Sequence, residues 1–121
     1  MQLDLADAQR AFQASVEAFA ARAVAPHAAA IDQGGEFPRA VLGDAAAEGL
    51  LGLTIPEAWG GRGLDYVSYA VAIEALSRVS ATVGVSLVVH HSLVADLIAR
   101  AGTTAQKDAW LRRLEIGRAH V

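Results

Sequence analysis

The chain contains no cysteine, few prolines and few aromatic residues. Without cysteine it has neither disulfides nor a thiol nucleophile, which is the composition expected of a cytoplasmic protein. Three prolines interrupt it, and 6% of its residues are aromatic. Neither sign of charge is in large excess, because ten Lys and Arg stand against thirteen Asp and Glu, for a net charge of −3. This balance excludes the basic surface of a nucleic-acid-binding protein.

The sequence also lacks the long apolar runs of signal peptides and membrane spans. Its first segment, MQLDLADAQRAF, is acidic and has no apolar centre, so we do not expect a signal peptide. The longest stretch without Asp, Glu, Lys or Arg covers residues 79–95 and includes Ser, Thr and His. A membrane span needs about 20 mainly apolar residues, so we expect none here. We expect residues 79–95 to form the central, most buried helix of a soluble domain.

Helical periodicity is abundant. Apolar residues recur every three or four positions from Leu5 to Ala23, and Pro26 predicts a kink in that first helix. The apolar run LLGLTIP has no partner strand elsewhere in the sequence, so we expect a buried extended connector. At 121 residues the chain fits one domain. The expected fold class is all-α, an orthogonal or up-down bundle of about five to six helices, with later helices near 39–48, 66–77, 79–100 and 104–114.

A cluster of glycines, Gly60, Gly61 and Gly63, interrupts the helical pattern and raises the question of a phosphate loop. The dinucleotide-binding motif G-x-G-x-x-G lacks its third glycine here, and no lysine occurs before Lys107 to make a Walker motif. Asp65 is a natural N-cap for the next helix, and its charge would repel a phosphate there. The cluster therefore predicts a tight structural corner between two helices.

The stretch FPRAVLGDAAAEGLLGLTIPEAWGGRGLDYVSYAVAIEALSRVSATVGV resembles the N-terminal helical domain of the acyl-CoA dehydrogenases. The segments GVSLVVHHSL and AGTTAQKDAWL follow it in the order and at the separations found in that family. The resemblance covers residues 5–114, and the linked set of motifs is specific. We therefore expect residues 1–114 to be this domain, with the glycine cluster as the corner between its second and third helices.

The resemblance implies a flavoenzyme of three domains that binds FAD and removes two hydrogens from an acyl-CoA thioester. In the family the carboxylate base and most flavin contacts come from later domains, after a run similar to L-T-E-P-x-x-G-S-D. This chain has no such run. We therefore expect a fragment that is inactive alone, with no catalytic residue and no assigned flavin contact. For the parent enzyme the resemblance implies electron-transfer flavoprotein as a partner and a homo-oligomer, a tetramer.

By resemblance, the helix over residues 79–95 lines the end of the acyl pocket. Ser86, Val89, His90 and Leu93 share one helical face by their spacing, and we expect this face to contact substrate. The alternative is that all four pack in the core. Adjacent His90 and His91 point about 100° apart on a helix, so we expect them to hold no metal.

Two other functions remain open at this point. The chain could be the N-terminal part of a related flavin oxidase or monooxygenase, since the distinguishing base belongs to a later domain. It could also be a free-standing helical binding module, which would bind FAD or an acyl-CoA tightly by itself.

The last seven residues, EIGRAHV, depart from the family pattern inside a helix. They match the in-frame translation of a common sequencing-library adapter, so we expect residues 115–121 to be an adapter-derived tail. The alternative is a genuine short C-terminal tail. In either case neither Glu115 nor His120 is expected to be catalytic.

Overall fold

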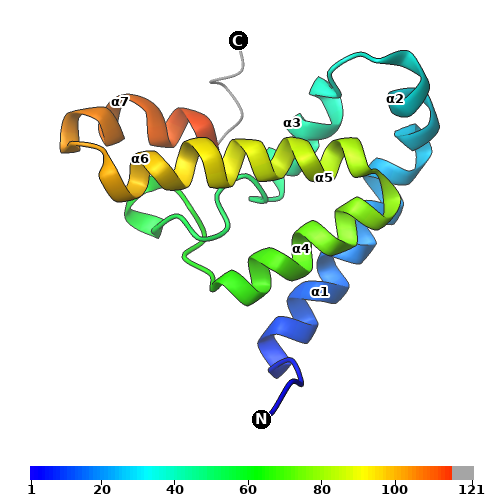
Figure 1. The fold of residues 1–121 in the computed structure, drawn as a ribbon, viewed down its shortest axis with the longest axis horizontal. Coiled ribbons are helices and arrows are strands. Elements are labelled where there is room, and N and C mark those ends of the chain that lie inside the picture. The colour runs from blue at the N-terminus through cyan, green and yellow to red at the C-terminus, as the bar shows by residue number, and fades with distance from the viewer. Residues whose placement is uncertain (116–121) are drawn as a thin grey trace.

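The structure is a computed structural model that describes residues 1–115. Of the expected tail, residues 115–121, it describes Glu115, while residues 116–121, His120 among them, lie outside the described part. Within residues 1–115 all secondary structure is helical, which confirms the all-α fold class (Figure 1). The α-helices are α1 (Asp7–Phe19), α2 (Ala28–Gly34), α3 (Arg39–Ala47), α4 (Tyr66–Val79), α5 (Ala81–Val88), α6 (Asp96–Ala101) and α7 (Thr104–Glu115).

Four short segments of other helical types join these helices or stand between them. Two are π-helical, η1 (Ala20–Val24) and η4 (Val89–Ala95), and two are 3₁₀-helical, η2 (Ala25–His27) and η3 (Glu57–Trp59). Because η1 and η2 link α1 to α2, and η4 links α5 to α6, the described chain consists of five rods and one isolated turn. This is within the expected number of helices.

The first rod bends where Pro26 falls, as expected. Pro26 lies in η2, whose tight turn separates α1 from α2. Proline cannot donate a backbone hydrogen bond and crowds the preceding turn, so a regular α-helix cannot continue through it. The rod ends at Gly35, which has φ of 66°. Helix α3 then begins at Arg39, as expected, and Pro38 occupies its N-cap position.

Residues 50–56 form the expected buried connector. Leu51, Leu53 and Ile55 are fully buried. The connector is not part of a sheet, but its backbone is bonded to the residues that follow the glycine corner. The Leu64 amide donates to the Leu53 carbonyl at 2.7 Å, and the Gly63 amide donates to the Ile55 carbonyl at 2.9 Å. The connector and the corner therefore form one closed loop between α3 and α4.

The glycine corner is structural, as predicted. Gly60 and Gly63 have φ of 95° and 60°, values that glycine adopts without strain. Gly61 packs so closely that an added Cβ would lie 2.1 Å from the Ile55 carbonyl oxygen. Asp65 caps α4 by accepting a hydrogen bond from the Ser68 amide at 2.8 Å, and that bond lowers the pKa of the Asp65 carboxyl. The helix N-terminus is thus already occupied by a carboxylate.

The large apolar cluster lies between α1, η1, α3, the connector, α4 and α5. Helices α1 and α4 pack side by side, and α5 packs on α4 and runs back from its end at an angle (Figure 1). The cluster combines the periodic residues of α1 with those of α4 and the connector. Its buried members are Phe12, Val16, Phe19, Ala20, Val24, Val41, Leu42, Ala45, Leu50, Leu51, Leu53, Ala72, Ala75, Leu76, Val83 and Leu87.

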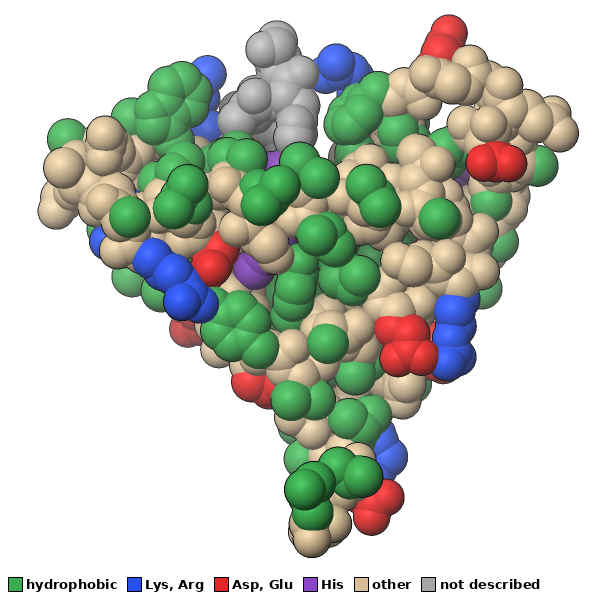
Figure 2. All heavy atoms as spheres, in the orientation of Figure 1, with side chains coloured by type: hydrophobic (Ala, Val, Ile, Leu, Met, Phe, Trp, Pro, Cys, Tyr) green, Lys and Arg blue, Asp and Glu red, His purple; other side chains and the backbone are tan. Residues whose placement is uncertain are grey.

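The rod formed by α5, η4 and α6 is not the most buried element, so that expectation was wrong. One side of it packs inward, but Val85, Leu93 and Leu97 on the other side are 62%, 64% and 59% exposed. The rod runs along the outside of the molecule, and apolar side chains gather over it (Figures 1 and 2). The uncharged composition of residues 79–95 therefore reflects two apolar sides, of which the described chain covers only one.

The same rod, Ala81–Ala101, is long and apolar enough to cross a membrane by length and composition alone. Core helices of soluble proteins can meet the same criterion. Here its inner side contributes Val83 and Leu87 to the large cluster and Ala95 to a smaller one.

Helix α7 begins with the expected capping box. The Gln106 amide donates to Thr103 Oγ1 at 3.2 Å, and the Thr103 amide donates to Gln106 Oε1 at 2.9 Å. A small apolar cluster holds α7 against the second half of the neighbouring rod and the connector. It consists of Ile55, Ala95, Leu111 and Leu114, with Trp59, Ile98 and Ala99 packed around it.

Candidate functional site

The site predicted from the sequence lies at a hollow on the outer side of α5 and η4. The hollow has a volume of about 430 Å³. Of the four predicted residues, three line it: Ser86, Val89 and His90. The other lining residues come from the loop before α3, from the same rod and from α7: Phe37, Val85, Val94 and Leu114.

Leu93, the fourth predicted residue, lies outside this hollow because η4 is a π-helix. The prediction assumed α-helical spacing, in which Leu93 follows Val89 by one turn. In a π-helix the hydrogen bonds join residues five apart. Val94, five residues after Val89, therefore takes the place expected of Leu93 and lines the hollow.

The lining is suited to hydrocarbon and offers little acid-base chemistry. Ser86 donates its hydroxyl to the Thr82 carbonyl at 2.8 Å, so this polar group is already engaged within its own helix. His90 is 3% exposed and lies at the inner edge of the hollow. The remaining lining side chains are apolar. The hollow can therefore bind an apolar group and exclude water from it, but none of its described lining residues is a carboxylate that could act as a base.

A buried polar cluster lies on the opposite side of the wide η4 turn from the hollow. The His91 ring is 1% exposed and stacks on the Tyr69 ring, with centroids 4.5 Å apart. His91 Nε2 lies 3.2 Å from the Thr54 amide nitrogen and 3.1 Å from Thr54 Oγ1. Beside it, Tyr69 Oη and Ser92 Oγ are 2.7 Å apart. These contacts join the connector, α4 and η4.

The sequence did not indicate this cluster, since His91 was weighed only as a metal ligand. Adjacent His90 and His91 are both buried within the π-helical segment η4. Within the described part of the chain no group of three His, Cys, Asp or Glu side chains is placed to hold a metal ion.

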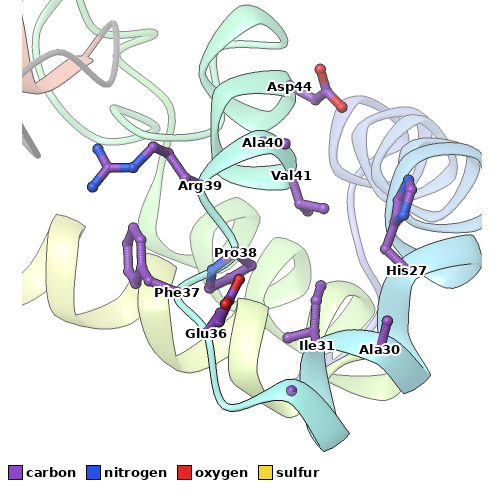
Figure 3. Close-up of a pocket in the computed structure, with 11 residues that line it drawn as sticks. His27, Ala30, Ile31, Glu36, Phe37, Pro38, Arg39, Ala40, Val41 and Asp44 are labelled. Carbon is purple, nitrogen blue, oxygen red and sulfur yellow. The ribbon is translucent and has the colours of Figure 1, made fainter.

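A second hollow, of about 350 Å³, opens between α2 and α3. Ile31 from α2 and Val41 from α3 point toward each other across it, and His27 and Asp44 stand at its edges (Figure 3). Its polar residues are exposed, and its lining residues come from helices that contact each other little in this region. It has none of the buried polar groups that characterise a built ligand site.

Comparison with known proteins decides the family. The model of the acyl-CoA dehydrogenase N-terminal domain matches residues 6–118. The chain belongs to the acyl-CoA dehydrogenase family. Its match to that family is confined to the N-terminal domain, which agrees with the resemblance and with the helical fold.

Similar proteins include acyl-CoA dehydrogenases of plants and bacteria. The chain is 42% identical over 116 residues to the mitochondrial isovaleryl-CoA dehydrogenase of Oryza sativa subsp. japonica, covering 92% of this chain and 28% of that one. It is similar to a chain in a structure described as the electron transferring flavoprotein of Acidaminococcus fermentans, with a TM-score of 0.91, 31% identity, and coverage of 98% and 31%. It is also similar to the acyl-CoA dehydrogenase of Bacillus anthracis solved with FAD, with a TM-score of 0.86, 30% identity, and coverage of 94% and 19%. The chain thus spans less than a third of each of these relatives.

The acyl-CoA dehydrogenase domain contains lining residues that sequence reasoning missed. Phe37 and Leu114 are distant in sequence from the rod, and no periodic pattern connects them to it. Phe37 could have been noticed because it is a large apolar residue in the loop before Pro38, outside any helix that would bury it in the core. Nothing in the sequence indicates that Leu114 lines the hollow, because an apolar residue at its position in α7 is expected simply to pack in the core.

Proposed function

We propose that this chain forms one wall of the acyl pocket in an FAD-dependent acyl-CoA dehydrogenase, an enzyme that introduces an α,β double bond into an acyl-CoA thioester. One observation supports this most directly: the apolar hollow lies on the same outer side of the rod 81–101 as an uncovered strip of exposed apolar side chains, Val85, Leu93 and Leu97. A domain that worked alone would have to hide such a surface. A wall against which a fatty chain and further domains pack would present it.

In this proposal the residues of the chain bind and orient substrate rather than react with it. Val89 and Val94 present branched side chains to the hydrocarbon, and the buried ring of His90 limits how far it can enter. Excluding water from the acyl chain strengthens the electrostatic interactions on which proton removal depends. The Leu93 contact expected from the sequence stays a prediction, and its exposed side chain suits a contact with another domain better than one inside the hollow.

FAD would supply the acceptor for the β hydride, while a carboxylate outside this chain takes the α proton. We assign no flavin contact to residues 1–115. The glycine corner, the one segment whose composition suggested phosphate binding, is closed by the Asp65 cap. In the parent enzyme we propose electron-transfer flavoprotein as the electron acceptor and a homotetrameric assembly. The cytoplasmic location and the adapter origin of residues 115–121 stay predictions.

A chimera tests the proposed wall. Residues 6–114 would replace the matched segment of the rice isovaleryl-CoA dehydrogenase, and dehydrogenation would be followed with acyl-CoA substrates of increasing length. Val89→Trp fills the hollow and should raise KM about tenfold or more, most for the longest substrate. Val67→Trp is the control, because Val67 lies on α4 and is 48% exposed, close to the 45% of Val89. Equal effects of the two substitutions would contradict the assignment.

The binding-module alternative is tested with the chain alone. The proposed wall is incomplete without the rest of the enzyme, so titration with FAD or with an acyl-CoA should show no saturable binding by calorimetry. Tight binding of either ligand by the 121-residue chain would favour the free-standing module.

A further inference from the structure

We propose that His91 is a positioning residue: as a neutral ring that accepts hydrogen bonds at Nε2, it ties the connector to the wide η4 turn and so fixes the side chains that line the hollow. This inference rests on the proposed function only in calling that lining an acyl wall. The tie itself is a property of residues 54, 69, 91 and 92 and can be tested separately.

The Thr54 amide determines which nitrogen of His91 carries the proton. A backbone N–H can only donate, so the 3.2 Å contact requires His91 Nε2 to accept. The ring proton of neutral His91 must then reside on Nδ1. Nδ1 has no hydrogen-bond partner in the described part of the chain, so the ring is held by Nε2 and by its stacking on Tyr69. The arrangement is specific to the less common tautomer of histidine.

The tie matters because η4 is wider than an α-helix and needs support from outside. A π-turn is rare, and where it occurs it is frequently found at functional sites. Here His91 anchors the inner side of η4 to Thr54 of the connector, and the next residue, Ser92, is hydrogen-bonded to Tyr69. On the outer side of the same turn, Val89, His90 and Val94 line the hollow. A change in the His91 contacts would therefore alter the spacing of those lining residues.

The charged and titratable groups around His91 come from three elements. From α4 the Tyr69 ring stacks on it, and from the connector Thr54 contributes its amide and its hydroxyl. From α6 Asp96 is the nearby charge, and that carboxylate is engaged by Arg100 at 2.9 Å and by Tyr66 Oη at 3.1 Å. Burial lowers the pKa of His91 below its usual value of 6.5, and Asp96 opposes this shift.

Protonation would break the hydrogen bond from the Thr54 amide, because His91 Nε2 would then carry a proton facing that N–H and could only donate, to Thr54 Oγ1. The folded-state pKa is lowered, so the stability contributed by neutral His91 is complete above pH 6.5 and is lost as the pH falls toward the folded-state value. The hollow should therefore keep one geometry at neutral and alkaline pH and change it in acid.

The test uses the 121-residue chain labelled with ¹⁵N and with ¹³C methyl groups. At pH 7.5 the ¹⁵N spectrum should show His91 protonated at Nδ1 and unprotonated at Nε2. On acidification, the Val89 and Val94 methyl resonances should shift with the same midpoint as the His91 ring, below pH 6.5. Protonation of Nε2 at pH 7.5, or methyl resonances that ignore the titration of His91, would overturn the proposal.

Two substitutions separate positioning from simple packing. His91→Gln keeps a hydrogen-bond acceptor near the Nε2 position but does not titrate, so the methyl resonances should stay fixed from pH 7.5 to 5. His91→Leu keeps the bulk but loses the acceptor, and the Thr54 amide should exchange about tenfold faster than in His91→Gln, as expected for one lost hydrogen bond. Equal protection of Thr54 in the two variants would contradict the tie. Should His91→Leu fail to fold, the wild-type titration and His91→Gln carry the same test.

The chimera described above distinguishes this inference from the proposed function. There His91→Leu should raise KM several-fold at pH 8 with a smaller effect on kcat, and His91→Gln should restore it. A chimera that binds no acyl-CoA while the NMR results hold would refute the acyl wall but leave the tie intact. Unchanged KM in His91→Leu, in a chimera that is active and sensitive to Val89→Trp, would refute positioning alone.

Discussion

The two apolar clusters of this domain are closed in different ways. The large cluster is enclosed by α1, η1, α3, the connector, α4 and α5, and its members include Phe12, Phe19 and Leu76. The small cluster has four buried residues and is followed directly by Glu115, whose carboxyl is buried against Gly52. In the described part of the chain neither Glu115 oxygen has a hydrogen-bond partner. Burial within the same small domain can thus stabilise one region and leave another dependent on pH.

This contrast predicts that stability is uneven along the chain. Local unfolding follows the distribution of buried apolar contacts. Helix α7 is held by the small cluster and by one hydrogen bond from Arg112 to the Ala58 carbonyl, at 2.7 Å. It should open before α1 and α4, and the following substitutions measure the difference.

The largest effect is expected in the large cluster. Leu76 is fully buried, and Leu76→Ala should lower the free energy of unfolding by about 3 to 4 kcal/mol, from lost burial and the cavity left behind. Urea denaturation followed by circular dichroism measures the change. Leu97→Ala, at an exposed position of α6, is the control and should cost less than about 0.5 kcal/mol. A similar cost for both would mean that the uncovered strip is packed in solution.

The second-largest effect is expected at Glu115, where a substitution should raise the free energy of unfolding. Burial raises the pKa of the Glu115 carboxyl to about 8, so the folded state favours the neutral form. The stability that neutral Glu115 contributes to the fold is complete below the unfolded-state pKa of about 4.5. It is lost as the pH rises through the folded-state pKa of about 8, by up to about 1.4 kcal/mol per pH unit. Glu115→Ala should remove this dependence and stabilise the chain by about 2 to 3 kcal/mol at pH 8.

The measurement is urea denaturation of both proteins at pH 5, 6.5 and 8. Glu17→Ala, at an exposed position of α1, provides the control for loss of one negative charge. Parallel stability curves for wild type and Glu115→Ala would show that the carboxyl finds a partner in solution.

A smaller and local effect is expected in the small cluster. Leu111 is fully buried, and Leu111→Ala should weaken the docking of α7 by about 2 kcal/mol. Amide hydrogen exchange should then accelerate about thirtyfold in α7 and remain unchanged in α1 and α4. Acceleration of the same size in all three helices would show that the two clusters unfold as one unit.

The smallest effect tests the start of α7. Thr103→Ala removes the oxygen that accepts from the Gln106 amide and should cost about 1 kcal/mol. Thr104→Ala is the matched control, because Thr104 is the next residue and is also exposed. Exchange of the first amides of α7 reports the difference, and equal exchange in the two variants would mean that the capping box does not form.

Local signals predicted the helix ends well because each depends on nearby residues. Asp65 and Thr103 mark helix starts through their own side-chain hydrogen bonds, and glycines with positive φ mark the corner. The π-helical segments were not predicted, because no sequence signal distinguishes them from α-helix and their support comes from residues distant in the sequence. Leu93 was placed wrongly because α-helical spacing was assumed for a π-helical segment, in which residues five apart lie one above the other.

The burial of residues 79–95 was overestimated for a different reason. Composition shows that a surface is apolar but does not show what covers it. Val85 and Leu97 have the same character as Val83 and Leu87, and only the fold separates the exposed pair from the buried one. Likewise, no local pattern indicates the role of His91, because its partner Thr54 lies 37 positions away.

The wide turn over Val89–Ala95 also bears on how this domain can vary in length. A π-turn contains one residue more than an α-helix needs for the same path. Deleting a single residue there would let the segment close into a regular α-helix along the same path, so the residues after it would keep their orientation about the helix axis. Asp96 would stay beside Tyr66, and α7 would keep its contacts with the small cluster. A homologue that is one residue shorter in this stretch should therefore dock its last helix in the same way but lack the wide turn.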